Sequence, residues 1–99
     1  MANFYGWTPT NITTNTTTLV RSGPGIMHTL VVNKSVASAV ITIFDSLTNA
    51  GTKIGTITLS SGGVTDMVPL DGVYDCAFVN GLTIVTSAAT DITVNWAPS

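Results

Sequence analysis

The fold class of this chain is decided by residues 80–96, which read NGLTIVTSAATDITVNW. Near the end of this stretch, Ile92, Val94 and Trp96 alternate with polar residues. Successive side chains of a β-strand point to opposite faces of a sheet, so this alternation predicts a strand with one buried face and one wet face. The stretch begins with an Asn-Gly pair between two apolar runs, which predicts a hairpin turn at Asn80-Gly81.

The same chemistry extends along the chain, which holds eighteen threonines and many valines and isoleucines. These β-branched residues favour a pleated surface over a helix. Residues 26–32 and 40–44 are more continuously apolar, which is typical of central strands covered on both faces, by the chain itself or by a neighbouring subunit. No segment has a sustained helical period. We expect strands at residues 16–21, 26–33, 40–45, 53–59, 64–68, 74–80, 82–86 and 92–96.

The expected fold is therefore all-β, a two-sheet antiparallel β-sandwich of jelly-roll type with seven to eight short strands. With 99 residues, the chain is long enough for one domain with one core, spanning residues 1–99. Residues 1–18 differ from the rest, because Phe4, Tyr5 and Trp7 precede a run rich in Thr and Asn. We expect an extended N-terminal arm whose three aromatic side chains bind a partner or a sister subunit; the alternative is that they cap the domain's own core.

The composition argues against several classes of function. Charged residues make up 8% of the chain, against about 25% in ordinary soluble domains. With a net charge of −2 and basic residues only at Arg21, Lys34 and Lys53, the chain lacks the positive patch that nucleic-acid binding requires. A surface of short neutral side chains suits packing against other protein copies, although an ordinary secreted β-domain is the simpler alternative.

Few residues are suited to catalysis. His28 is the only histidine and lies in an apolar run, where we expect a half-buried structural side chain on the same face as Leu30 and Val32. Cys76 is the only cysteine, and a small buried apolar role is favoured over a reactive thiol. One histidine and one cysteine cannot form a transition-metal cluster. We therefore expect no enzyme, no cofactor and no metal.

Two weaker possibilities involve oxygen ligands and sugars. Asp71 and Asp75, together with Asp66, are placed to line a calcium site, but the EF-hand spacing is absent and solvated turn aspartates are favoured. Carbohydrate binding is a second hypothesis, since β-sandwiches commonly host lectin sites and aromatic rings stack on sugars. The aromatic candidates are Trp7, Trp96, Tyr5 and Tyr74, of which Trp96 is in phase with the core residues of its strand.

No membrane or export segment is expected. The longest mostly apolar stretch, residues 36–44, is far shorter than the ~20 residues that a membrane helix needs. The N-terminal residues MANFYGWTPT have neither a basic region nor a continuous apolar region of the kind that secretory signals carry.

Residues 40–59, VITIFDSLTNAGTKIGTITL, taken with residues 80–96, resemble short virion proteins of tailed bacteriophages. The shared pattern is a hydrophobic-Thr-hydrophobic-aromatic-Asp strand, a turn of small residues, a Gly-Thr-Lys strand, and a closing Gly-Leu-hydrophobic-Val-Thr hairpin. The resemblance covers the chain from Val31 to Trp96 with gaps and leaves the N-terminal arm unmatched. It implies a β-sandwich structural protein without catalytic residues, often trimeric, that decorates the capsid or associates with a fibre.

From this resemblance we expect a non-enzymatic capsid decoration (cement) protein, made in the host cytoplasm and located in the virion, with the major capsid protein and its own copies as partners. The alternative is a tail or fibre-associated carbohydrate-binding module for host recognition. In a homotrimer, the strands at residues 26–32 or 40–44 are expected at the symmetry axis. Val40→Asp or Ile43→Asp would then disrupt folding or trimers.

Overall fold

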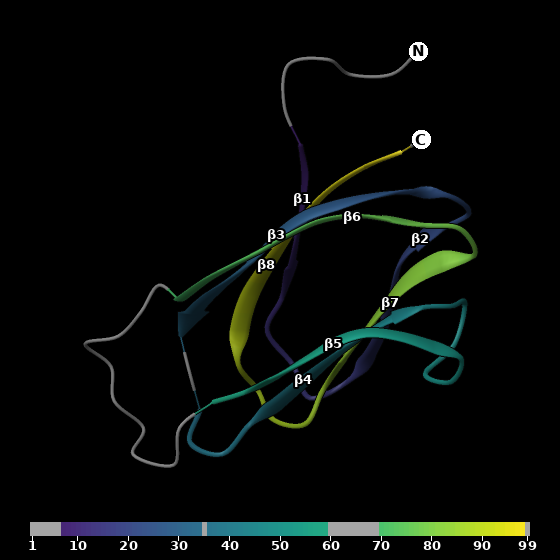
Figure 1. The fold of residues 1–99 in the computed structure, drawn as a ribbon. Helices are drawn as coiled ribbons and strands as arrows, with labels where there is room; N and C mark the ends of the chain where they lie inside the picture. The colour runs from purple at the N-terminus through teal and green to yellow at the C-terminus, as the bar shows by residue number, and fades with distance from the viewer. Residues whose placement is uncertain (1–6, 35, 60–69, 99) are drawn as a thin grey trace.

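The computed structural model describes residues 7–34, 36–59 and 70–98, and these form two four-stranded antiparallel sheets without a helix. The strands are β1 (Thr8–Ile12), β2 (Thr17–Ser22), β3 (Gly25–Lys34), β4 (Val40–Asp45), β5 (Thr52–Thr58), β6 (Leu70–Phe78), β7 (Gly81–Thr86) and β8 (Asp91–Pro98). Sheet A has the order β1-β8-β3-β6 and sheet B the order β2-β7-β4-β5 (Figure 1). The described residues thus include no helix long and apolar enough to cross a membrane.

This strand order is that of a jelly roll, in which the chain forms one long hairpin that then rolls into two layers. Each strand of the first half pairs with its counterpart in the second half: β1 with β8, β2 with β7, β3 with β6 and β4 with β5. The apex of the long hairpin is the loop between β4 and β5, where Gly51 has φ +117° and so supplies the left-handed backbone that the turn needs. The expected β-sandwich of jelly-roll type is confirmed.

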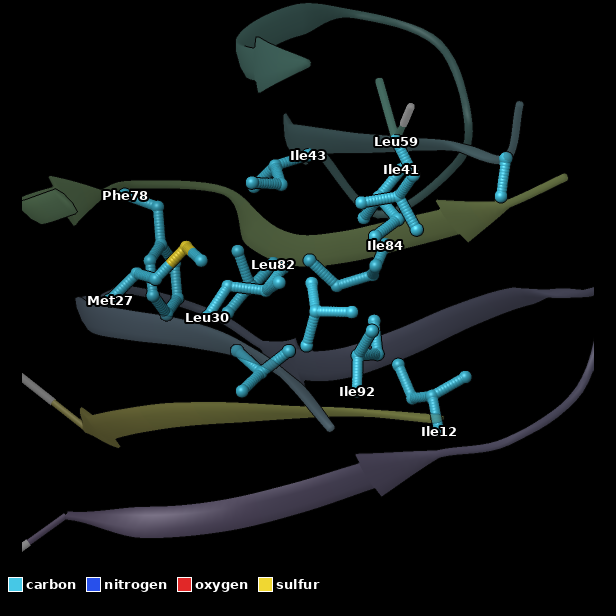
Figure 2. Close-up of a cluster of buried hydrophobic side chains, with 13 residues drawn as sticks. Ile12, Met27, Leu30, Ile41, Ile43, Leu59, Phe78, Leu82, Ile84 and Ile92 are labelled. Atoms are coloured by element: carbon cyan, nitrogen blue, oxygen red, sulfur yellow. The ribbon is translucent and has the colours of Figure 1, made fainter. Parts of the chain in front are cut away.

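The core lies between the two sheets and is built from the inward positions of the alternating strands. Figure 2 shows these side chains converging from both layers. The most apolar runs occupy the middle of each sheet, because β3 lies between β8 and β6, and β4 between β7 and β5. Their expected central position is confirmed. The buried hydrophobic residues are Ile12, Met27, Leu30, Val32, Ala39, Ile41, Ile43, Leu59, Phe78, Leu82, Ile84, Ile92 and Val94.

The N-terminal boundary of the sandwich differs from the expectation. Thr8–Ile12 is strand β1, paired with β8 at the edge of sheet A, so this part of the expected arm belongs to the domain. Ile12 is buried in the core and Thr10 accepts a hydrogen bond from the Trp96 indole at 3.0 Å. A single apolar residue gives too little alternation to predict a strand from the sequence. The strand forms because its backbone pairs with β8. The expected strand at residues 64–68 lies outside the described residues.

The Asn80-Gly81 pair forms a turn, but the expected hairpin there is wrong. β6 belongs to sheet A and β7 to sheet B, so the pair is a corner between the layers. Gly81 is needed for its size: a Cβ atom there would lie 2.8 Å from Leu47 Cδ2 and 2.9 Å from the Arg21 carbonyl oxygen. The gap between the expected strands at residues 64–68 and 74–80, where Asp71-Gly72 has the composition of a turn, also proves wrong, because both residues pair with β3 inside β6. Pairing along the ten-residue β3 outweighs the local preference for a turn.

Two buried threonines differ in how their hydroxyl groups are satisfied. The Thr86 hydroxyl donates to the Thr14 carbonyl at 2.6 Å and accepts the Thr16 N–H at 3.1 Å, which fixes the connection between β1 and β2. The Thr90 hydroxyl, equally buried, has no hydrogen-bond partner among the described residues. A buried hydroxyl without a partner costs free energy that a bonded one does not.

The same isosteric substitution should therefore have opposite effects at these two positions. Thr86→Val should lower the free energy of unfolding by about 1–2 kcal/mol, because it removes both hydrogen bonds. Thr90→Val should leave the stability unchanged or raise it by up to about 1 kcal/mol. Urea denaturation of the two variants checks this. A Thr90→Val protein as destabilised as Thr86→Val would contradict the difference.

Candidate functional site

The sequence singled out three aromatic residues near the N-terminus, and the structure describes one of them. Trp7 stacks on His28 with ring centroids 4.5 Å apart and planes 12° from parallel, and it is 40% exposed. Phe4 and Tyr5 lie outside the described residues. Trp7 therefore packs against its own chain, away from the core, and its expected role in partner binding stays a prediction.

The Trp7 side chain has to cross a strand to reach His28. Trp7 directly precedes β1, His28 belongs to β3, and β8 lies between those two strands in sheet A. With neighbouring strands about 4.8 Å apart, the indole reaches across about 10 Å of sheet surface. The β8 residue beside Ile26 of β3 is Ala97, whose methyl side chain projects only a short way from the sheet. A small side chain at Ala97 leaves room for the ring.

His28 also contacts Asp75 of β6, with Nδ1 of the imidazole at Oδ1 of the carboxylate. The side chains of His28 and Asp75 are 33% and 58% exposed, so both reach solvent on the outer face of sheet A. Trp7, His28 and Asp75 thus form one continuous group, which we call the outer triad. Its members come from both halves of the chain, and only the folded sheet brings them together.

The backbone is irregular at the outer triad. Against β8, His28 is the extra residue of a β-bulge, because Met27 and Thr29 pair with the adjacent residues Trp96 and Asn95. The register against β6 also shifts, but there the extra residue lies in β6, since Met27 pairs with Cys76 and Thr29 with Val73. Asp75, opposite it, has φ +46°, a left-handed conformation that is rare in a strand and costs roughly 1–2 kcal/mol. Bulges and left-handed non-glycine residues concentrate at functional sites, where they redirect side chains.

The bulge also explains why the orientation predicted for His28 is wrong. In a regular strand His28 shares a face with Leu30 and Val32, but those two residues are fully buried whereas His28 lies on the outer face. One extra residue in a strand reverses the facing of everything before it. The expected turn aspartate at Asp75 is likewise a strand residue with a histidine partner.

The remaining sequence candidates do not join the outer triad. Cys76 is half-buried against the core, and desolvation, followed by the negative charges of Asp45 and Asp75, raises the pKa of its thiol. A raised pKa disfavours the reactive thiolate. Trp96 also packs against the core. Asp66 and the side chain of Asp71 lie outside the described residues, and the described part of the chain holds no group of three or more possible metal ligands among His, Cys, Asp and Glu.

The two outer faces of the sandwich differ in chemistry. On sheet A, polar side chains form hydrogen bonds with one another: Asn11 and Asn33 both donate to the Asp91 carboxylate, and Asn95 donates to the Thr29 hydroxyl. On sheet B the outward positions are neutral apart from Lys53, as far as the strands are described. These positions are Thr17, Leu19, Val40, Thr42, Phe44, Thr56, Thr58 and Val85, and we call them the neutral face.

Asp45 closes the corner between the two sheets. Its carboxylate accepts the backbone N–H groups of Val79 at 3.0 Å and Asn80 at 2.8 Å. Partial burial acts to raise the pKa of Asp45, but hydrogen bonds from the backbone N–H groups of Asn80, Val79 and Gly81 outweigh it, and the pKa is lowered. The ionised carboxylate is thus the form that stabilises the fold.

Asp45→Asn should therefore weaken the corner at neutral pH by about 1–2 kcal/mol, toward the low end for hydrogen bonds to a charged group, because water screens this partly exposed carboxylate. Because the native-state pKa is lowered, the contribution of Asp45 is complete above its unfolded value of about 3.9 and is lost as pH falls through the native-state value. The stability difference between parent and variant should shrink in acid. Urea denaturation at pH 7 and pH 3 measures it, and a constant difference would contradict the assignment.

Comparison with known proteins adds no relative: no protein-family model matches the chain, and a search of curated proteins found no match.

Proposed function

We propose that this chain is a non-enzymatic structural protein of a tailed-phage virion, which decorates the capsid and stabilises the head through repeated protein–protein contacts. The observation that carries the proposal is the neutral face of sheet B. It combines Leu19, which is 47% exposed, with partly exposed Val40, Phe44 and Val85 among threonines. A broad sheet face whose described strands carry one outward charge, Lys53, suits close contact with another protein surface.

Repetition makes a weak contact sufficient. A capsid presents many identical sites, so each copy needs only a modest contact area. The stabilising free energies of the individual contacts add up over the whole shell. The jelly roll is an architecture that capsid proteins and lectins share, and it supports the proposal at the level of architecture alone, because one fold serves many functions. The resemblance of residues 40–59 and 80–96 to phage virion proteins supports the same reading. The major capsid protein and sister copies, arranged as trimers, are the proposed partners.

The test is to locate the protein on particles of the phage that encodes it. Immunogold labelling should place it on the heads, and particles lacking the gene should lose their DNA at a lower temperature than the parent. Label confined to tails or fibres would overturn the decoration role in favour of the fibre-associated alternative. Particles without any label would remove the virion assignment altogether.

Two surface variants test the face itself. Leu19→Asp places a charge on the neutral face of sheet B, and Ile26→Asp places one on the outer face of sheet A, where Ile26 is 38% exposed. Both should fold, because both side chains already reach water. Only Leu19→Asp should reduce binding to capsids stripped of the protein, in a cosedimentation assay. Equal binding by the two variants would exclude the neutral face as the contact.

A test of whether Phe4 and Tyr5 contribute to capsid attachment requires a truncation that leaves the fold intact. Deleting residues 1–10 would remove three of the five residues of β1 and expose the edge of β8. Deleting residues 1–6 keeps β1 intact. If Phe4 and Tyr5 contribute to attachment, this shorter deletion should weaken cosedimentation with capsids while leaving the melting temperature unchanged.

A further inference from the structure

The outer triad is part of neither the hydrophobic core nor the neutral face of sheet B. Trp7, His28 and Asp75 all reach solvent on the outer face of sheet A. Holding them there involves a bulge in β3 and a left-handed aspartate in β6. A sandwich can be built without either irregularity, so their presence together at one place points to a role for these side chains outside folding.

The triad retains free hydrogen-bonding capacity. Within the described residues, the Asp75–His28 contact uses Nδ1 of the histidine and Oδ1 of the carboxylate. Asp75 Oδ2, His28 Nε2 and the Trp7 indole N–H have no partner in that part of the chain. By contrast, the Trp96 indole N–H is bonded to Thr10. An acceptor, a ring nitrogen and a donor therefore stand beside the apolar surface of an indole that is 40% exposed.

The surroundings of the triad extend this apolar surface. Ile26, two residues before His28, is 38% exposed. It pairs with Ala77 of β6 on one side and Ala97 of β8 on the other. The methyl side chains of Ala77 and Ala97 project only a short way from the sheet next to the indole. A flat ligand can therefore lie over Ile26 and the two alanines with its edge turned toward the carboxylate of Asp75.

We propose that the outer triad is a shallow carbohydrate-binding site for a neutral pyranose residue of a glycan. One face of a pyranose ring carries C–H groups that pack on an aromatic ring, while its hydroxyl groups form hydrogen bonds with a carboxylate and an imidazole. Asp75 and the net charge of −2 disfavour phosphate and other anions. His28 and Asp75 alone supply too few ligands for a structural metal ion.

The openness of the site sets the expected affinity. Three side chains on an outer sheet face cover a small part of a monosaccharide, so one site binds at millimolar concentration. Many copies on one particle would bind a glycan-coated surface much more tightly through multivalency.

The experiment uses the full chain labelled with ¹⁵N and a panel of methyl glycosides of glucose, galactose, mannose and N-acetylglucosamine at millimolar concentration. At least one glycoside should shift the NMR signal of the Trp7 indole N–H together with amide signals around Ile26 and Ala77. The Trp96 indole N–H, held by Thr10, serves as an internal control and should not move. If every glycoside leaves the Trp7 signal in place, the proposal is overturned.

Variants separate recognition from folding. Trp7→Ala and Asp75→Asn should each weaken binding of the active glycoside by about tenfold, the scale of one lost stacking or charged hydrogen-bond contact. Asparagine tolerates the left-handed backbone of Asp75 and keeps its shape, so Asp75→Asn should fold normally. Leu19→Ala, on the opposite sheet, is the matched control and should bind like the parent. Undiminished binding by both Trp7→Ala and Asp75→Asn would place the sugar elsewhere and overturn the site.

Discussion

Ile43→Asp should yield no folded domain. Ile43 is fully buried between the two sheets, in the middle of β4, where a carboxylate would have neither water nor a counter-charge. The cost of burying an unpaired charge is several kcal/mol or more, comparable with the entire stability of about 5–10 kcal/mol that a chain of this size has. Circular dichroism and the dispersion of amide NMR signals measure the loss.

Val40→Asp is the matched comparison on the same strand. Val40 is partly exposed on the neutral face, so an aspartate there reaches water and the domain should fold. The sequence alone suggested either residue as a probe of a trimer, but only Val40 lies where such a contact would form. If copies meet through the neutral face, Val40→Asp should give a folded protein with fewer oligomers in analytical ultracentrifugation. A cooperatively unfolding Ile43→Asp protein would contradict the position of the core.

Phe78→Ala should have the second largest effect, a loss of about 3–5 kcal/mol of unfolding free energy. Phe78 is 1% exposed and is the largest of the fully buried side chains among the described residues (Figure 2). Its ring occupies the space beside Gly25, where a Cβ atom would lie 2.6 Å from the Phe78 ring and 2.7 Å from the Ala97 carbonyl oxygen. Truncation leaves a cavity that the surrounding strands cannot close.

The neighbouring residue provides the control for this substitution. Val79 is 70% exposed, so Val79→Ala should change the stability by no more than about 0.5 kcal/mol. Gly25→Ala should destabilise the parent, since the glycine site has no room for a methyl group. In the Phe78→Ala background this cost should fall but not vanish, because the Ala97 carbonyl remains. Thermal denaturation of the four proteins measures the coupling, and strictly additive losses would contradict the contact.

The β-sandwich could be predicted because its causes are local. Alternation at Ile92, Val94 and Trp96 fixes which side chains face inward, and β4 has the predicted limits because its apolar run is bounded by a loop on each side. The virion role and the trimer stay proposals, since they depend on partners rather than on this fold, and the absence of catalysis stays a prediction.

The outer triad could not be predicted from the sequence, because it depends on a bulge in β3 and on contacts between residues far apart in the chain. Period-two reasoning placed His28 on the core face, and only the bulge reverses it. Asp75 lies 47 residues away from His28 in the chain, and Trp7 reaches His28 across an intervening strand. A lone histidine and an aspartate near a glycine carry no signal of mutual proximity in a single sequence.

The amino-acid sequence by itself determined the strand-rich fold class, the neutral surface composition and most of the inward-facing residues, because side-chain alternation and β-branched chemistry act over a few neighbouring positions. Only the tertiary structure decided that Asn80-Gly81 is a corner between sheets, that Thr8–Ile12 joins the sandwich, and that Trp7 meets His28 and Asp75. These features depend on which strands become neighbours and on the register between them. That choice is made by the packing of the whole core, whose contributing residues are far apart in the chain.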